Sequence, residues 1–172
     1  ALSYEHVGKF SQAITLFQRS LAIEERIYGN ESLGVSASLN NLAQAYAAIG
    51  DYRHALPLMK RRLAISEKLL EPGHDDVALA LNNLGDLYRR MKQFDQARRM
   101  LERSLAIFEN KFGPNHNLVA TGLNNLAKLR FDMGAFADSL SLLKRSVAIS
   151  EAALGPSHPE MATSFHNLAV LY

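Results

Sequence analysis

The hydrophobic pattern of residues 33–74 predicts two helices joined by a tight turn. In the first stretch, apolar residues recur at the i, i+3, i+4, i+7 spacing of one helical face: Leu39, Leu42, Ala43, Tyr46 and Ile49. Gly50-Asp51 interrupts this pattern, and the two residues suit a left-handed helix end and a helix N-cap. A second apolar stripe begins at Tyr52, and Glu71-Pro72-Gly73-His74 ends the pair. No stretch shows the alternation typical of a β-strand.

The same pattern returns with a period of 42 residues. Its clearest markers are four equally spaced asparagines: Asn41, Asn83, Asn125 and Asn167. Their surroundings repeat as well, because Leu39-Asn40-Asn41-Leu42-Ala43 returns as Leu81-Asn82-Asn83-Leu84-Gly85. The repeat predicts turns at equivalent places: Gly8-Lys9-Phe10, Lys92-Gln93-Phe94 and Gly134-Ala135-Phe136. Such self-similarity indicates a solenoid, in which each helix pair buries its apolar face against its neighbours.

We therefore expect one all-α domain over residues 1–172. Its units are residues 1–32 (partial), 33–74, 75–116, 117–158 and 159–172 (partial). The sequence opens and stops inside first helices of the repeat, which suggests a window on a longer array. Apolar side chains at the two ends should then be partly bare: Phe10, Ile14 and Phe17 at one end, and Leu168, Leu171 and Tyr172 at the other.

Composition argues against several functional classes. The 19 basic and 17 acidic residues give a net charge of +2, which provides no bulk attraction for nucleic acid or an anionic membrane. There is no Cys, and no apolar run approaches the roughly 20 residues that a membrane span needs. The first residues do not resemble a signal peptide, so we expect a cytoplasmic protein. No nucleophile, phosphate-loop or zinc-protease motif is present, so we expect no enzyme, cofactor or metal site.

These repeats resemble the tetratricopeptide repeat family. The family signature places a large apolar residue, Leu, a small residue and Tyr on the first helix, as in Leu81, Leu84, Gly85 and Tyr88. The long period, the Leu-Asn-Asn-Leu-Ala block and the Gly-Pro-x-His loop are similar to the kinesin light chain subtype. The resemblance covers the entire chain. It implies a right-handed superhelix that binds partner proteins along a concave groove.

In the family, the first-helix face opposite the apolar stripe lines that groove, so it is the candidate binding surface here. Its residues are Asn41, Gln44, Leu79, Asn83, Asp86, Arg90, Thr121, Asn125, Lys128 and Asn167. An asparagine amide offers both a donor and an acceptor, and can pair with a peptide backbone whatever its side chains are. We favour this role for the central asparagines; the alternative is that they bond helix to helix between units. The preceding asparagines are interpreted as structural: Asn40, Asn82 and Asn124.

Charges suggest the chemistry of the partner. Arg89, Arg90 and Lys128 make the middle of the groove face basic, offset by Asp86 and Asp132. This favours an acidic peptide with an apolar anchor. Further basic runs are predicted to lie on the solvated outer faces of second helices: Lys60-Arg61-Arg62 and Arg98-Arg99.

One histidine recurs in each inter-unit loop, at His74, His116 and His158. Residues one repeat apart cannot converge on one metal ion, whose bonds to histidine are near 2 Å. We therefore expect each histidine to cap the helix that follows it.

The sequence thus predicts a protein-interaction scaffold that binds a partner segment in the groove. Two alternatives stay open. The array could be structural and self-associate head to tail, or it could be the sensor part of a larger signalling protein.

Overall fold

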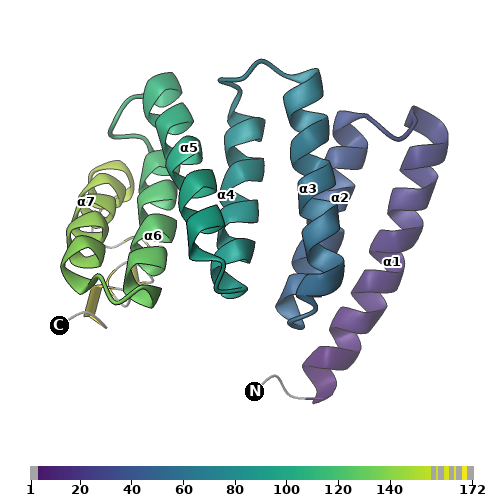
Figure 1. Cartoon of the computed structure of the whole chain (residues 1–172), viewed down its shortest axis with the longest axis horizontal. Helices are drawn as coiled ribbons and strands as arrows, with labels where there is room; N and C mark the ends of the chain where they lie inside the picture. The colour runs from purple at the N-terminus through teal and green to yellow at the C-terminus, as the bar shows by residue number, and fades with distance from the viewer. Residues whose placement is uncertain (1–3, 156–157, 159–160, 163–164, 166–167, 170–172) are drawn as a thin grey trace. The chain divides into compact units, whose positions relative to one another are not determined.

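The computed structural model describes residues 4–155, 158, 161–162, 165 and 168–169, with side chains from Phe10 onward. Seven helices follow one another between Tyr4 and Leu154, and the described residues form no strand (Figure 1). This confirms the all-α prediction. None of the helices in the described part is long and apolar enough to cross a membrane. The chain divides into two compact units, Ala1–Pro72 and Gly73–Tyr172, and each is considered by itself.

The first unit contains three helices. α1 (Tyr4–Tyr28) packs against α2 (Leu33–Ala48), and α2 pairs with α3 (Tyr52–Leu69). A short turn joins α2 and α3, which run in opposite directions (Figure 1). One apolar cluster joins all three helices, and its members are Ile14, Leu21, Val35, Leu39, Leu42, Ala45 and Ile65. The apolar stripe expected on the first helix therefore lies in this core.

The end residues expected to be partly bare behave unevenly. Ile14 is buried, so that expectation is wrong for it, because the core formed with α2 reaches this side of α1. Phe10, Phe17 and Leu168 are half-buried, as expected. Leu171 and Tyr172 lie outside the described residues.

The second unit contains two complete helix pairs. α4 (Asp75–Arg90) pairs with α5 (Phe94–Phe112), and α6 (Asn117–Asp132) pairs with α7 (Phe136–Leu154). α6 also packs against α5 and reaches α4, so the two pairs share one core. A buried cluster spans them: Ala78, Phe108, Val119, Ala120, Leu123 and Ile149.

The turns within the helix pairs form where the repeat predicts them. Gly50 and Gly134 adopt φ values of 80° and 79° between their paired helices, a conformation that suits a residue without a Cβ. Lys92 occupies the same repeat position between α4 and α5, and it also has a positive φ, of 58°. The geometry of the turn is therefore kept even where the glycine is replaced.

Helix starts also follow the sequence signals. The Asp51 carboxylate accepts the His54 backbone N–H at 3.2 Å, and caps α3. His74 Nδ1 accepts the N–H of Asp76 at 3.1 Å, and His116 Nδ1 accepts the N–H of Leu118 at 3.2 Å. The cap role predicted for these two histidines is confirmed. The residues after His158 lie outside the described set, so its cap role stays a prediction.

One predicted turn is wrong. Gly8-Lys9-Phe10 does not separate two helices, because α1 is continuous from Tyr4 to Tyr28. A glycine inside a helix costs only about 1 kcal/mol relative to alanine. A turn at this place needs a preceding helix that packs on the following one, and only about one helical turn precedes Gly8 in the structure.

Two second-helix serines one repeat apart bond first-helix carbonyls at the same offset. Ser104 Oγ donates to the Ala78 carbonyl at 2.7 Å, and Ser146 Oγ donates to the Ala120 carbonyl at 2.8 Å. In α3 the same repeat position is Arg62, which is only 8% exposed and donates to Asn40 Oδ1 at 3.0 Å. The expectation of a solvated face at Lys60-Arg61-Arg62 is therefore wrong for Arg62.

Candidate functional site

Helices α4 and α6 bring seven of the predicted binding residues to one side of the second unit. We call this set the α4–α6 face: Leu79, Asn83, Asp86 and Arg90 from α4, and Thr121, Asn125 and Lys128 from α6. α4 and α6 are the first helices of consecutive repeats, and they contact each other directly. Arg90, Thr121 and Lys128 are exposed, whereas the other four are half-buried.

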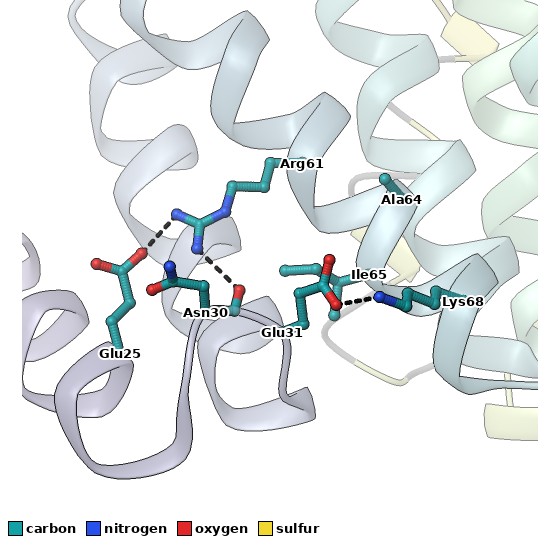
Figure 2. A pocket seen from close by; sticks show the side chains of 7 residues that line it. All are labelled: Glu25, Asn30, Glu31, Arg61, Ala64, Ile65 and Lys68. Atoms are coloured by element: carbon teal, nitrogen blue, oxygen red, sulfur yellow. Dashed lines mark hydrogen bonds and ion pairs between the residues drawn. The ribbon is translucent and has the colours of Figure 1, made fainter.

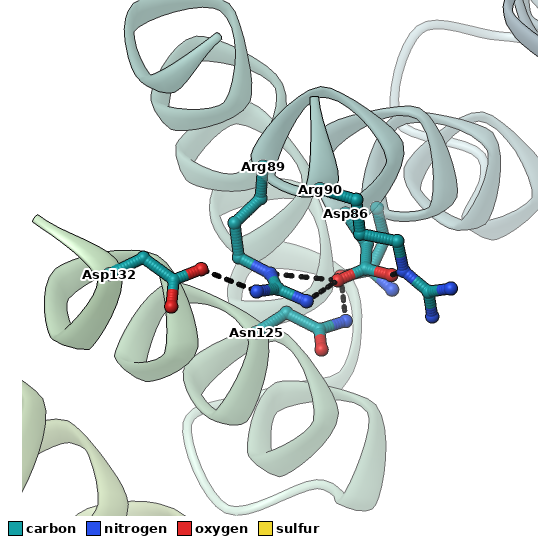
Figure 3. Close-up of polar contacts among 6 residues, drawn as sticks. Asp86, Arg89, Arg90, Asn125 and Asp132 are labelled. Atoms are coloured by element: carbon teal, nitrogen blue, oxygen red, sulfur yellow. Dashed lines mark hydrogen bonds and ion pairs between the residues drawn. The ribbon is translucent and has the colours of Figure 1, made fainter. Parts of the chain in front are cut away.

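An amide–amide hydrogen bond joins the two helices of this face. Asn125 Nδ2 donates to Asn82 Oδ1 at 3.1 Å, and Asn82 is 4% exposed. The structural interpretation of Asn82 agrees with this geometry. Asn125 forms a bond between helices, which is the alternative role that the sequence left open for the central asparagines. Its carboxamide also lies among the polar residues of the face (Figure 3). Its part in ligand binding stays a prediction.

Next to the amides, two carboxylates hold the arginines of α4 in place. Asp86 Oδ1 accepts from Arg89 Nη2 at 2.9 Å, and Asp86 Oδ2 accepts from Arg90 Nε at 2.8 Å (Figure 3). Arg89 also donates to Asp132 of α6, so this ion pair crosses between repeats. Burial alone would lower the pKa of Arg89, but the hydrogen bond with Asp132 and the charge of Asp86 outweigh it and raise that pKa.

This network changes the electrostatics expected for the face. Arg89 is shared by two carboxylates and is mostly covered, so little of its charge reaches solvent. Lys128 is exposed, and the structure gives it no ion-pair partner among the described residues. Arg90 uses its Nε for Asp86, and its two terminal nitrogens point away from the carboxylate (Figure 3). The accessible positive charge is therefore confined to Lys128 and the outer edge of Arg90.

The remaining predicted residues have simpler surroundings. Leu79 packs against the buried cluster of the second unit, and the Thr121 hydroxyl donates to the Asn117 carbonyl at 3.2 Å. In the first unit, Asn41 and Gln44 are exposed on α2, and Gln44 donates to Asn40 Oδ1 at 3.4 Å. Asn167 lies outside the described residues.

A separate pocket of about 440 Å³ lies where α1, the following loop and α3 meet in the first unit (Figure 2). Arg61 pairs with Glu25 and donates to the Asn30 carbonyl at 2.8 Å, while Lys68 pairs with Glu31. Every charged residue of the lining therefore has an opposite partner. This makes the pocket a helix-to-loop junction, with no group left over to attract a charged ligand.

The second unit repeats this junction two periods later. Arg145 pairs with Glu109 at 2.7 Å and donates to the Pro114 carbonyl at 3.4 Å. These arginine ties join consecutive second helices and the loop between them. A different ion pair links α5 to α4, because Lys111 donates a hydrogen bond to Asp75. This hydrogen bond holds the pKa of Asp75 below its usual value. Sequence reasoning missed these ion pairs, although the constant spacing of Arg61 and Arg145 from their glutamates was a usable signal.

No group of histidine, aspartate and glutamate side chains in the described residues could hold a metal ion. The polar groups of the α4–α6 face are amides, a hydroxyl, a lysine and paired charges. Such a set can hydrogen-bond and attract an opposite charge, and it offers no nucleophile beside a general base.

Comparison with known proteins gives a consistent result. The family model described as "Tetratricopeptide repeat" matches residues 1–68, 62–110, 76–152 and 118–172. The chain belongs to the tetratricopeptide repeat family. Proteins of this family generally mediate protein–protein contacts, and their scaffolds are generally not enzymes. No curated protein matches the chain at a significant level.

Solved structures agree on the type of tetratricopeptide repeat. A putative kinesin light chain from Podospora anserina, with nearly identical repeats, is 28% identical with a TM-score of 0.77 over 98% of this chain and 80% of that one. A point variant of that protein gives the same identity and coverage with a TM-score of 0.78. BtubC (BKLC) from P. vanneervenii is 24% identical, with a TM-score of 0.79 over 95% of this chain and 65% of that chain. The predicted family and its kinesin light chain-like subtype are confirmed.

Proposed function

We propose that this array binds an extended segment of a partner protein along its first helices, with the α4–α6 face as the principal contact in the second unit. The supporting observation is the composition of that face. It combines exposed Thr121, Lys128 and Arg90 with the Asn125 amide, on two helices that a shared hydrogen bond holds side by side. Amide and hydroxyl side chains can pair with the N–H and C=O groups of a bound peptide backbone. A surface that is already rigid loses little conformational entropy when the peptide binds.

The spacing of the helices supports an extended ligand. Packed helices lie roughly 8–10 Å apart, and an extended chain advances about 3.3 Å per residue. A segment that crosses α4 and α6 would thus meet the asparagine row at about every third residue. The side chains that vary between repeats would then select the sequence of the ligand.

The chemistry of the ligand follows from the accessible charge. Lys128 and the outer edge of Arg90 are the exposed cationic groups of the face, which favours an acidic side chain in the partner. Half-buried Leu79 provides an apolar contact for an anchor residue. We therefore propose an acidic segment with an apolar anchor as the ligand class.

Selection from a displayed peptide library on the intact chain tests the proposed function. Recovered peptides should be enriched in Asp or Glu beside an apolar residue, and should protect backbone amides of α4 and α6 from hydrogen exchange. Peptides that protect only the second helices α5 and α7 would place the binding surface on the other side of the array.

The amide role is tested by two substitutions that break the same internal hydrogen bond. Asn82→Ala and Asn125→Ala both remove the bond between α4 and α6, so each should lower the unfolding free energy by about 1 kcal/mol. Only Asn125→Ala also removes the amide from the binding face. The double variant Asn83→Ala/Asn125→Ala should bind a selected peptide several-fold more weakly than Asn82→Ala does, as measured by calorimetry. If the double variant and Asn82→Ala bound the peptide with equal affinity, the role of the asparagine row would be purely structural.

The charge role is tested at low and high salt. Lys128→Gln should weaken a selected acidic peptide by about two- to fivefold at low ionic strength, as expected for an exposed ion pair. The difference should shrink as the Debye length falls below about 10 Å, and Arg90→Glu should shift the preference toward basic peptides. Arg99→Gln is the matched control, because it removes one positive charge from an exposed position of α5. If the affinity for the selected peptide were the same at low and high salt, the peptide would be recognised through apolar contacts and not through charge.

A further inference from the structure

The guanidinium of Arg89 is held from two helices at once. On its own helix, Asp86 Oδ1 accepts from Arg89 Nε at 3.0 Å and from Nη2 at 2.9 Å. Asp132 of α6 accepts from Nη1, so the two carboxylates approach Arg89 from opposite sides (Figure 3). If Asp132 moves away, both bonds to Asp86 remain. The guanidinium then keeps its direction while Nη1 becomes available to another acceptor.

Asp132 lies at an unfavourable place in its own helix. It is the last residue of α6, where the carbonyl end of the helix carries a negative partial charge. A carboxylate at this end destabilises α6, and the contact with Arg89 compensates for that. The Asp132 side chain is 33% exposed, so it can turn into solvent without crossing a packed core. An external carboxylate that took its place on Arg89 would therefore release Asp132 at little cost to α6.

The ion pair between Arg89 and Asp132 is particular to this part of the chain. The adjacent repeats carry other residue types at both positions: Ala47 and Phe131 in place of Arg89, and Ala48 and Arg90 in place of Asp132. The buried serines of α5 and α7 differ in this respect, because the same residue makes the same bond one repeat later. The ion pair is therefore an addition to the α4–α6 face and not a part of the repeat pattern.

The charges of this network cancel each other. Arg89 and Arg90 stand against Asp86 and Asp132, so the network has no net charge while Asp132 stays on Arg89. The Arg89 side chain is only 18% exposed, and water screens a charge less strongly in such a place than at an open surface. A ligand carboxylate on Nη1 would make the same charge-assisted bond that Asp132 makes.

We propose that Asp132 occupies the Arg89 site in the free protein in place of the acidic side chain of a ligand, and that the ligand displaces it on binding. This displacement rests on the proposed function, because it describes how an acidic segment engages the α4–α6 face. Arg89 becomes a direct contact of the ligand, in addition to Lys128 and the outer edge of Arg90. Asp132 lowers the affinity by competition, which favours a ligand whose carboxylate reaches Nη1 over a segment with a diffuse negative charge.

Asp132→Asn tests the competition. The substitution keeps the shape of the side chain and removes the competing charge, so a selected acidic peptide should bind several-fold more tightly, as measured by calorimetry. The melting temperature should fall slightly at the same time, because an ion pair between α4 and α6 is lost. A residue with a structural role alone would not raise the affinity when it is replaced.

Asp138→Asn is the matched control for net charge. Asp138 is exposed in the first turn of α7, and its replacement changes the charge of the chain by the same amount. At physiological ionic strength it should leave the affinity for the peptide nearly unchanged, because exposed charges that are not in contact are largely screened. On the ligand side, exchanging the acidic residue of the peptide for the matching amide should abolish the gain from Asp132→Asn.

Arg89→Gln separates a direct contact from a general effect of charge. In the Arg89→Gln background, Asp132→Asn should give no gain in affinity, because the guanidinium that it would unmask is absent. A general effect of charge would give the same gain in both backgrounds. The double variant Arg89→Gln/Asp132→Asn removes both partners of the pair and leaves Asp86 bonded to Arg90, so it should remain folded in circular dichroism.

Library selection on the unmodified chain and on Asp132→Asn in parallel distinguishes this displacement from the proposed function. Acidic peptides that bind both chains, and bind Asp132→Asn more tightly, support both. Acidic peptides that bind the two chains equally overturn the displacement and leave the binding function standing, whereas a failure of both chains to recover any peptide overturns both. A gain of equal size in Asp138→Asn, or one that persists in the Arg89→Gln background, assigns the effect to net charge and overturns the displacement.

Discussion

Leu84→Ala is expected to lower the unfolding free energy by about 2–5 kcal/mol, which would make it one of the most damaging single substitutions in the second unit. Leu84 is 3% exposed on the stripe of α4 that also carries Leu81 and Tyr88. Truncation removes buried methyl groups and leaves a cavity that the paired helices cannot close without losing other contacts. Thermal and urea unfolding followed by circular dichroism measure the loss.

An exposed leucine provides the control for this substitution. Leu69 at the end of α3 is 45% exposed, so Leu69→Ala should change the unfolding free energy by no more than about 0.5 kcal/mol. If Leu84→Ala and Leu69→Ala had the same unfolding free energy, the assignment of Leu84 to the buried stripe of α4 would be wrong. The opposite side of α4, which forms the proposed binding face, would then be misassigned as well.

Gly85→Ala is expected to destabilise the second unit by about 1–3 kcal/mol, although alanine is the better helix former. A Cβ at Gly85 would lie 2.7 Å from Leu101 Cγ and 2.8 Å from Leu101 Cδ2, which is closer than such atoms can approach. Leu101 of α5 is fully buried and lies directly against the backbone of α4 at Gly85. The added methyl group must therefore push the helices apart or force Leu101 into a strained rotamer.

The preceding repeat shows one way in which the clash can be relieved. Ala43 stands there at the position of Gly85 and Met59 at that of Leu101, whereas the following repeat combines Ala127 with Leu143. Leu101→Met in the Gly85→Ala background should therefore recover part of the lost stability, because an unbranched side chain adapts to a smaller space. Gly73→Ala is the control, since a Cβ there meets no atom within 4 Å, and it should not destabilise. If Gly85→Ala and the unmodified chain had the same melting temperature, the contact between Gly85 of α4 and Leu101 of α5 would have room for a methyl group.

The sequence predicted most of the fold because its signals are local and recur in each repeat. Asp51, His74 and His116 cap helices through bonds to residues two or three positions away, so the chain segment alone carries the information. Gly8 has the same local signal as Gly50, yet it lies inside α1. A turn also needs packing of the helices on both sides, and a single segment cannot show whether that packing exists.

The candidate surface could be predicted only in outline. Helical periodicity places Asn83 and Asn125 on the same face, but it gives no relative shift between consecutive first helices. That shift brings Asn125 to Asn82 and Arg89 to Asp132, and thereby decides which polar groups are already satisfied inside the protein. Arg62 shows the same limit, because its neighbours Lys60 and Arg61 suggest an exposed charged run while tertiary packing buries it.

The bonds between neighbouring helices have a consequence for how such a chain can change in length. The bonds from Ser104 and Ser146 to first-helix carbonyls each span 26 positions, and the two arginine–glutamate pairs each span 36. Inserting or deleting a few residues within such a span alters the offset and separates the partners. Duplicating or removing a complete 42-residue segment keeps every offset. The gene can therefore lengthen or shorten the array by whole repeats, and each added copy arrives with its stabilising partners already in register.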